Sequence, residues 1–143
     1  MKNVLEYLEH TAAAFPQKTG VEDQNGSLTF AKLLELSQRA GSSLPENLAL
    51  GQPVAVFLEK GIPALTSFFA TVYGGGFYAL MNPSLPPVRI RQMQSVLQAE
   101  WVITSRDRLD AARQFFPAAS LLLIEELSSG EIRQERLDFS GVP

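Results

Sequence analysis

Three consecutive glycines, Gly74 to Gly76, are the first residues whose type and spacing could do chemistry. Glycine-rich loops bind phosphate when they follow a strand and open a helix, because backbone N–H groups and the helix N-terminus then face the anion. Here the glycines follow an apolar helical stretch and lead into a short apolar strand. A helix C-terminus presents carbonyl groups and partial negative charge, which repel phosphate. The order of the elements therefore favours a helix stop over a phosphate-binding loop.

Two carboxylate pairs are candidates for acid–base chemistry: Glu125 with Glu126, and Asp107 with Asp110. The first pair follows a predicted parallel strand, and α/β folds bind ligands at that edge. Neighbouring residues on a strand point to opposite faces, so we expect that Glu125 and Glu126 do not converge on one atom. Neither pair is assigned a catalytic role.

The remaining reactive residue types are sparse. His10 is the only histidine, and there is no cysteine, so neither a histidine pair for a metal nor a thiolate nucleophile is available. No serine lies in a Gly-x-Ser-x-Gly turn. We expect His10 to be a surface residue of an N-terminal helix, and the sequence predicts no catalytic, cofactor-binding or metal-binding residue.

Two larger sets of side chains are also expected to have structural roles and not to form a binding site. Five arginines could together bind an anion, but they are spread over two predicted helices that also carry acids. We therefore expect them to lie on solvent-exposed helix faces. They are Arg89, Arg91, Arg106, Arg108 and Arg113. Five aromatic residues flank the glycines, where packing between a helix and a sheet is favoured over an aromatic substrate pocket: Phe68, Phe69, Tyr73, Phe77 and Tyr78.

The composition is that of one globular domain. The chain has 143 residues, 45% of them hydrophobic, and a net charge of −3, which gives no bias toward nucleic acid or an anionic membrane. Acids interrupt the N-terminal stretch where a signal peptide needs an apolar run, and no apolar run approaches the roughly 18 residues of a membrane-spanning helix. We expect a cytoplasmic protein without nucleic-acid or membrane partners.

The apolar periodicity predicts the elements that must position these residues. A helix over Asn3–Ala14 precedes a hairpin with strands at Thr19–Glu22 and Ser27–Thr29, and a helix over Phe30–Leu44 has Thr29 as its N-cap. Short apolar strands then alternate with helices: strands Val54–Leu58, Phe77–Met81, Trp101–Thr104 and Leu121–Ile124, and helices Ile62–Tyr73, Pro86–Ala99 and Arg106–Phe115.

This alternation predicts βαβ units and the α/β class, with a parallel or mixed sheet flanked by helices after an N-terminal helix and a β-hairpin. Ser84 and Ser105 are candidate N-caps of the last two helices. Residues 1–124 are predicted to form a single α/β domain, and residues 125–143, where the periodicity is lost, a loop or frayed tail.

Several segments resemble core motifs of the adenylate-forming (AMP-binding) enzymes, which are the acyl-CoA synthetases, the adenylation domains of nonribosomal peptide synthesis and the D-alanine–carrier-protein ligases. Gly75–Pro83 (GGFYALMNP), followed by Arg89-Ile90, resembles the second core motif. Ser27–Leu33 (SLTFAKL) is similar to the first motif, from which it departs at Phe30 and Lys32. Further matches follow in family order, so that the resemblance runs from about Asn3 to about Asp107: Phe15–Lys18, Gly51–Val56 and Val102–Thr104.

The resemblance implies the N-terminal scaffold portion of an ATP-dependent acid–thiol ligase. Such an enzyme converts a carboxylate and ATP to an acyl-adenylate, with Mg²⁺ on the phosphates, and then forms a thioester with CoA or with carrier-protein pantetheine. By the same resemblance Arg89 takes the place of the motif arginine, which we expect to anchor the turn after Pro83. The acid and the choice between CoA and carrier protein stay open.

No stretch of the sequence matches the family's Ser/Thr/Gly-rich loop ending in Pro-Lys, or its later catalytic motifs. We therefore expect a truncated segment that is inactive alone, has no cofactor of its own, and has the remainder of the enzyme as its partner. Such a segment should self-associate through exposed apolar faces. The alternative is a stand-alone α/β interaction or binding module. A small nucleotide-binding Rossmann-like enzyme ranks last, because it needs a glycine loop after a strand.

Overall fold

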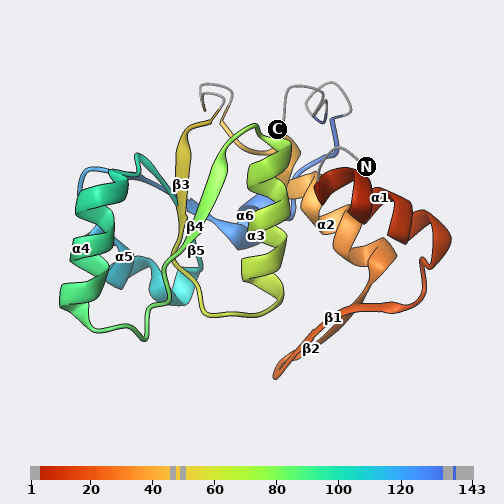
Figure 1. Ribbon diagram of the computed structural model, residues 1–143, viewed down its shortest axis with the longest axis horizontal. Helices are drawn as coiled ribbons and strands as arrows, with labels where there is room; N and C mark the ends of the chain where they lie inside the picture. Colours follow the sequence, from red (N-terminus) through yellow and green to blue (C-terminus); the bar gives the residue numbers. More distant parts are fainter. Residues whose placement is uncertain (1–3, 46–47, 49–50, 134–136, 138–143) are drawn as a thin grey trace.

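A computed structural model describes residues 4–45, 48, 51–133 and 137 (Figure 1). The N-terminal part contains the helix α1 (Val4–Ala14), the hairpin strands β1 (Thr19–Asp23) and β2 (Gly26–Thr29), and the helix α2 (Phe30–Ser42). Strands and helices then alternate: β3 (Pro53–Val56), α3 (Ile62–Tyr73), β4 (Phe77–Leu80), α4 (Pro87–Leu97), β5 (Trp101–Thr104), the 3₁₀ turn η1 (Arg106–Arg108), α5 (Leu109–Phe115), β6 (Ser120–Leu123) and α6 (Ile124–Leu127).

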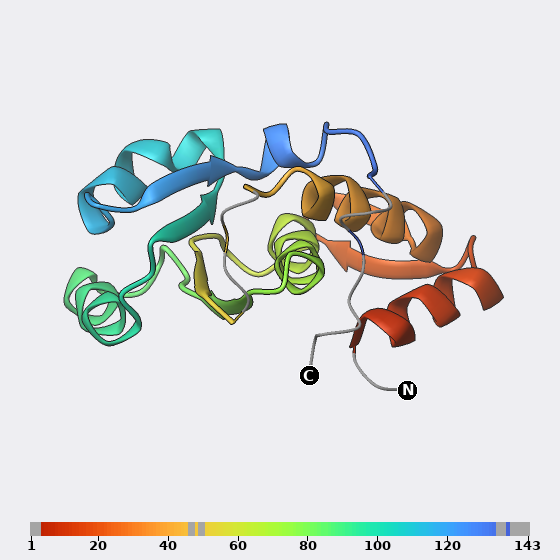
Figure 2. The same ribbon diagram turned by 90° about the horizontal axis from the view of Figure 1, so that it is seen from above.

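The four later strands form a parallel sheet in the order β4-β3-β5-β6, which confirms the predicted α/β class. Alternate residues of β3 face opposite layers, as strand geometry requires. Val54 and Val56 pack with α2, α3 and α6, whereas Ala55 packs with α4 and α5. Figure 2 shows α4 and α5 at one end of the molecule and α1 at the other.

The hairpin and α1 form a further layer on the outer side of α2 and α3. Leu5 and Leu8 of α1 pack with Leu33 of α2 and with Phe69 and Tyr73 of α3. The predicted hairpin is present, and its last residue caps α2 as predicted. Thr29 Oγ1 accepts the N–H of Lys32 at 3.1 Å. Asn3, the predicted start of α1, lies outside the described residues.

The two layers meet where α2 crosses α3 at Gly41. A β-carbon built on Gly41 would lie 2.8 Å from Cβ of Tyr73, which is closer than van der Waals contact allows. Tyr73 is buried, and its phenol is 3.5 Å from Nε2 of Gln38. Burial raises the pKa of Tyr73, so the neutral phenol is retained in the contact. Small residues on α2 are therefore required at the crossing.

Two predicted helix starts differ in the structure. Ser84 is not an N-cap, because α4 begins at Pro87 and Pro86 takes the N-cap position. The N–H of Ser84 instead donates to Oδ1 of Asn82 at 2.8 Å, which makes a local turn after β4. Ser105 does stand at the N-cap of η1, but its hydroxyl bonds to the Asp107 carboxylate.

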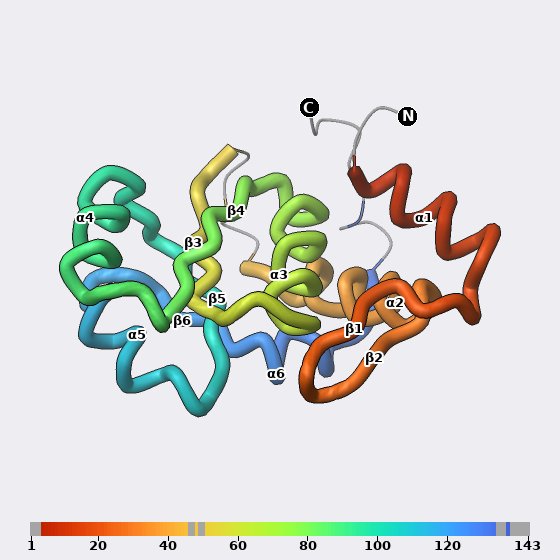
Figure 3. The backbone as a smooth tube through the Cα atoms, turned by 60° about the horizontal axis from the view of Figure 1, so that its bottom comes forward, coloured from red at the N-terminus to blue at the C-terminus, as the bar shows by residue number. Residues whose placement is uncertain are grey.

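The segment after β6 also differs from the predicted loop. Ile124 begins the short helix α6 instead of ending a strand, and Ile124 and Leu127 are buried in the core. Beyond α6 the chain lies against the C-terminal end of α2: Arg39 Nη1 donates to the carbonyl of Gly130 at 3.0 Å, and the N–H of Arg133 donates to Ser42 Oγ at 2.9 Å. Figure 3 follows this course from β6 through α6. The division into residues 1–124 and 125–143 stays a prediction, but the start of the second part packs on the first.

Replacing Gly41 by alanine tests the α2–α3 crossing. Alanine normally favours a helix over glycine, but here the added methyl group must displace Tyr73. We expect Gly41→Ala to lower the free energy of unfolding by about 1–3 kcal/mol in urea titrations. Gln92→Ala on the exposed face of α4 is the control and should change little. A more stable Gly41→Ala protein would contradict the close crossing.

The contact of Gly130 with Ser43 permits a double-mutant test. A β-carbon on Gly130 would overlap Ser43 Oγ, so we expect Gly130→Ala to cost about 1–3 kcal/mol in the free energy of unfolding. Removing the hydroxyl in Gly130→Ala/Ser43→Ala should recover most of this loss, because only Cβ of residue 43 then remains in close contact. Additive effects of the two substitutions in urea titrations would show that the segment does not pack here.

Candidate functional site

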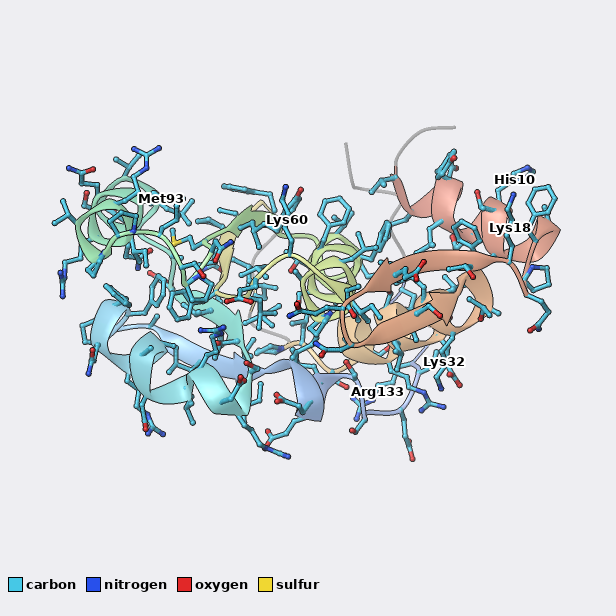
Figure 4. The ribbon with its side chains drawn as sticks, turned by 90° about the horizontal axis from the view of Figure 1, so that it is seen from below. His10, Lys18, Lys32, Lys60, Met93 and Arg133 are labelled. Atoms are coloured by element: carbon cyan, nitrogen blue, oxygen red, sulfur yellow. The ribbon has the colours of Figure 1, made fainter. Side chains whose placement is uncertain are left out.

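A polar cleft of about 830 Å³ lies at the carboxyl end of the parallel strands. This is the edge at which α/β sheets bind ligands. The loops after β3, β4 and β5, the start of α6 and the tip of the hairpin line the cleft: Glu22, Asp23, Gln24, Asn25, Leu58, Glu59, Lys60, Gly61, Pro63, Asn82, Ser84, Ser105, Asp107, Arg108 and Glu125. Figure 4 looks onto this edge and labels Lys60 near the centre of the view.

One hydrogen-bond network joins three of these loops. Nη2 of Arg108 donates to Oε1 of Glu59 at 2.7 Å, and Oγ of Ser84 donates to the same oxygen at 3.2 Å. The side chains of Arg108 and Glu59 are 34% and 44% exposed, so the ion pair contributes only about 0–1 kcal/mol to stability. The network fixes the relative positions of the three loops. In it, the Glu59 carboxylate is already bound by Arg108 and Ser84.

Asp23 of the hairpin occupies the N-terminus of α3. Its Oδ2 accepts the N–H of Ile62 at 2.9 Å, and its Oδ1 accepts the N–H of Asn25 at 2.8 Å. The Ile62 hydrogen bond, followed by that of Asn25, holds the pKa of Asp23 below its ordinary value. A β-carbon on Gly61 (φ +156°) would lie 2.8 Å from Oδ2, so glycine lets the carboxylate approach. The protein's own carboxylate takes the place an anion would need.

The pair Glu125–Glu126 lies on α6, so the predicted strand geometry is wrong for it. Both carboxylates bind one residue. Glu125 accepts the backbone N–H of Arg106 at 3.0 and 3.3 Å, and Glu126 Oε1 is 3.7 Å from Nη2 of the Arg106 guanidinium. The two groups therefore hold the start of η1 through different atoms of Arg106.

The second pair does not converge either. Asp107 accepts the Ser105 hydroxyl at the cleft, whereas Oδ1 of Asp110 lies 3.5 Å from Nη1 of Arg113 on α5. The side chain of Asp110 is 97% exposed, which is typical of a solvated helix face. Neither pair forms a joint carboxylate site.

The five arginines form no common anion site. Arg106, Arg108 and Arg113 each pair with a nearby acid, and the Arg91 guanidinium lies 5.2 Å from the ring centroid of Phe115. Arg89 is exposed on α4. In the turn at Pro83, Oδ1 of Asn82 accepts the N–H of Ser84, and the role of Arg89 as an anchor of this turn stays a prediction.

The aromatic residues around the glycines divide into two groups. Phe69 and Tyr73 are buried, as predicted for core residues. Phe77 and Tyr78 are 49% and 41% exposed, which the prediction of core packing did not anticipate. Tyr78 packs against Phe68, with ring centroids 4.1 Å apart and planes at 86°.

The glycine run closes α3, as the order of elements predicts. The N–H of Gly74 donates to the carbonyl of Ala70 at 3.0 Å, and the N–H of Gly76 donates to that of Thr71 at 3.1 Å. These N–H groups are therefore used within the helix end and do not form a phosphate cradle. His10 is exposed on α1, as expected, and lies away from the cleft in Figure 4.

The described part of the chain contains no group of three His, Asp or Glu side chains arranged to hold a metal ion. Among the described helices, none is long and apolar enough to cross a membrane. Several polar side chains that line the cleft bond to one another or to nearby backbone N–H groups.

The parallel sheet, the glycine-closed α3 and the preceding helix and hairpin form a fold that is also found in solved acyl ligases and peptide synthetases. The chain belongs to the AMP-binding enzyme family, whose model matches residues 8–140.

The similar proteins are peptide synthetases and acyl ligases. Nonribosomal peptide synthetase 7 of Aspergillus fumigatus is 33% identical over 139 residues, which are 94% of this chain and 6% of the synthetase. A benzoate CoA ligase from Burkholderia xenovorans superposes with a TM-score of 0.78 at 22% identity, over 92% of this chain and 29% of the ligase. The N-terminal subdomain of Klebsiella oxytoca NpsA, in complex with 3-hydroxybenzoyl-AMSN, gives a TM-score of 0.80 at 19% identity, over 100% of this chain and 35% of the subdomain. The chain therefore spans well under two thirds of these relatives.

Sequence reasoning missed the cap that Asp23 provides for α3. The residues Asp23 to Gly26 do predict a turn, and Asp is common there because its side chain accepts a nearby N–H. The partner Ile62 is 39 residues away, however, and nothing local to either residue indicates the pairing. The bond between Arg108 and Glu59 spans 49 residues and is hidden in the same way.

The lowered pKa of Asp23 predicts a pH dependence of stability. An acid whose pKa is lower in the folded state stabilises the fold above its unfolded value, here 3.8, and loses this contribution as the pH falls through the folded value. Asp23→Asn keeps only one acceptor oxygen. We expect it to be less stable than the parent protein above pH 3.8, with the difference shrinking at lower pH.

The measurement is a series of urea titrations from neutral to acid pH. Asp110→Asn, at an exposed carboxylate remote from α3, is the matched control and should show little pH-dependent difference. A stability difference for Asp23→Asn that stays constant below pH 3.8 would argue against the charged cap.

Proposed function

We propose that this chain is the N-terminal scaffold portion of an ATP-dependent ligase that joins a carboxylate to a thiol. The complete enzyme would convert the acid and ATP to an acyl-adenylate and pyrophosphate, and would then transfer the acyl group to CoA or to carrier-protein pantetheine. The match of the AMP-binding family model to residues 8–140 carries this proposal.

The residues of this chain do not fit ATP or Mg²⁺ by themselves. The N-terminus of α3 in the cleft is already capped by Asp23, and the glycine run uses its N–H groups to close α3. Carboxylates outnumber cations along the cleft, which disfavours a triphosphate. We therefore derive no catalytic step from this chain and assign the nucleotide and its Mg²⁺ to the rest of the longer enzyme.

The role proposed for this chain is to hold one side of the large domain in a fixed shape. The hairpin, the loops after β3 and β5, and η1 are tied together by Asp23, Glu59 and Glu125. The remainder of the enzyme is its first partner, and CoA or a carrier protein would meet the complete domain. A cytoplasmic location belongs to the same proposal.

The second candidate is a stand-alone α/β interaction module without catalytic activity. One observation favours it: helices of this chain already cover both faces of the sheet, so the described residues build a core of their own. The two candidates differ in whether a longer natural polypeptide completes the domain.

Pyrophosphate exchange separates the candidates. We expect the 143-residue chain to show only background exchange between ATP and labelled pyrophosphate with any carboxylic or amino acid in a panel. The natural reading frame, expressed to its stop codon, should show acid-dependent exchange, because it would add the missing phosphate loop and catalytic lysine. The readout is whether the longer polypeptide exchanges pyrophosphate faster than the 143-residue chain.

Exchange above background by the short chain would contradict the scaffold role. A stop codon directly after Pro143 in the source gene would end the ligase proposal for this chain and leave the interaction module. The heat-denatured short chain is the control for contaminating activity.

A further inference from the structure

The turn between β1 and β2 contains the only asparagine of the sequence that is followed by a glycine, Asn25-Gly26. Both residues are exposed, and the turn projects at the lower edge of the molecule in Figure 1. A β-carbon built on Gly26 (φ +149°) would meet no atom within 4 Å. The residue after Asn25 therefore puts no steric barrier between its own backbone nitrogen and the Asn25 side chain.

The side-chain amide of Asn25 is also free to move. In the described part of the chain it takes part in no hydrogen bond, although the backbone N–H of Asn25 donates to Oδ1 of Asp23. Asn82, which lines the same cleft, is different on both counts. Its Oδ1 accepts the N–H of Ser84 at 2.8 Å, and it is followed by Pro83, whose nitrogen carries no proton.

We propose that Asn25 is a site of spontaneous deamidation, and that the reaction releases the hairpin tip from α3. The Gly26 nitrogen loses its proton and attacks Cγ of Asn25, so that a new C–N bond forms, the Cγ–Nδ2 bond breaks and ammonia leaves. Water then opens the resulting succinimide ring. Opening at Cγ gives aspartate, whereas opening at the backbone carbonyl gives isoaspartate, in which the main chain runs through the former side chain. Water is the only co-reactant, and nothing is oxidised or reduced.

The product changes the residues that hold the hairpin tip on α3. Asp23 pairs with Gly26 across the turn and accepts the N–H groups of Asn25 at 2.8 Å and of Ile62 at 2.9 Å. Isoaspartate lengthens the main chain of this turn by one methylene group and adds a carboxylate beside that of Asp23. The turn can then no longer present Asp23 to Ile62 in the same geometry, so the first turn of α3 loses its cap.

The intact cap also restrains the reaction. The bonds from Ile62 and then Asn25 lower the pKa of Asp23 most, and the N–H of Gly26 lowers it further, so the carboxylate lies close to the nitrogen that must react. A negative charge disfavours the loss of a proton from a neighbouring group. Asp23 therefore slows the deamidation that would displace it, and a turn that has lost this carboxylate reacts faster.

Peptide mapping by mass spectrometry tests the site. The folded 143-residue chain is incubated at neutral and at mildly alkaline pH, and isoaspartate is detected by isoaspartyl methyltransferase labelling. We expect Asn25 to be converted at least about tenfold faster than Asn82, because Pro83 has no proton to lose. The rate at Asn25 should rise with pH. Equal rates at the two asparagines, or a rate at Asn25 that is independent of pH, would overturn the proposal.

Two substitutions in β1 test the restraint. We expect Asp23→Ala to speed the conversion of Asn25 by at least about threefold, because it removes the nearby charge. Glu22→Ala is the matched control and should have much less effect, since neighbouring residues on a strand point to opposite faces. In urea the unfolded parent and both variants should react at closely similar rates. The same ratios in urea as in the folded proteins would assign the effect to local sequence and contradict the restraint by the cap.

Amide hydrogen exchange tests the release of the tip. The isoaspartate form carries an additional negative charge and can be separated by anion exchange. We expect its Ile62 amide to exchange at least about fivefold faster than in the parent protein. The amide of Lys32, which Thr29 caps at the other end of β2, should be unaffected.

Asn25→Gln is the control for the released tip, because its longer side chain forms a ring much more slowly. Its Ile62 exchange should not change during incubation. An isoaspartate form with unchanged Ile62 exchange would show that the tip stays on α3 and would overturn the proposal.

Discussion

The close crossing of α2 and α3 is the contact on which the other layers depend. At Gly41 the two helices approach until no β-carbon fits beside Tyr73. The helix α3 is consequently buried between the sheet on one side and α1, α2 and the hairpin on the other. Its polar residues tolerate this burial because they bond within the helix: Thr66, Ser67 and Thr71 donate to carbonyls four residues earlier, at 2.7 to 2.9 Å.

The candidate site follows from that packing. The crossing places the hairpin tip at the N-terminus of α3, where Asp23 can accept the N–H of Ile62. The same carboxylate excludes an external anion, and Glu59 and Glu125 are likewise engaged by Arg108 and Arg106. A cleft whose polar groups are used to fix its own loops suits a scaffold. Apolar exposure lies elsewhere, for example on β4, where Phe77 and Tyr78 are 49% and 41% exposed.

Local patterns predicted most of the fold. The alternation of apolar strands with helices fixed the α/β class, and Asn25-Gly26 fixed the hairpin, because each pattern acts over a few neighbouring residues. The failures came where a competing local bond or the packing of the core overrode the local signal. Ser84 has a capping residue type, but Asn82 bonds its N–H first and α4 begins only at Pro87. Ile124 continues an apolar run, but it turns into α6 because its side chain and that of Leu127 fill the core beside α2.

The sequence by itself determined most of the elements, the family motifs and the glycine stop of α3, since all of these depend on residues close together in the chain. Only the tertiary structure decided which distant groups meet. Asp23 caps a helix 39 residues away, Arg39 binds the carbonyl of Gly130 across 91 residues, and Phe77 and Tyr78 are exposed because β4 lies at the edge of the sheet. An apolar strand has the same local pattern at the centre and at the edge, so its exposure depends on strand order, which is set by the packing of the whole chain.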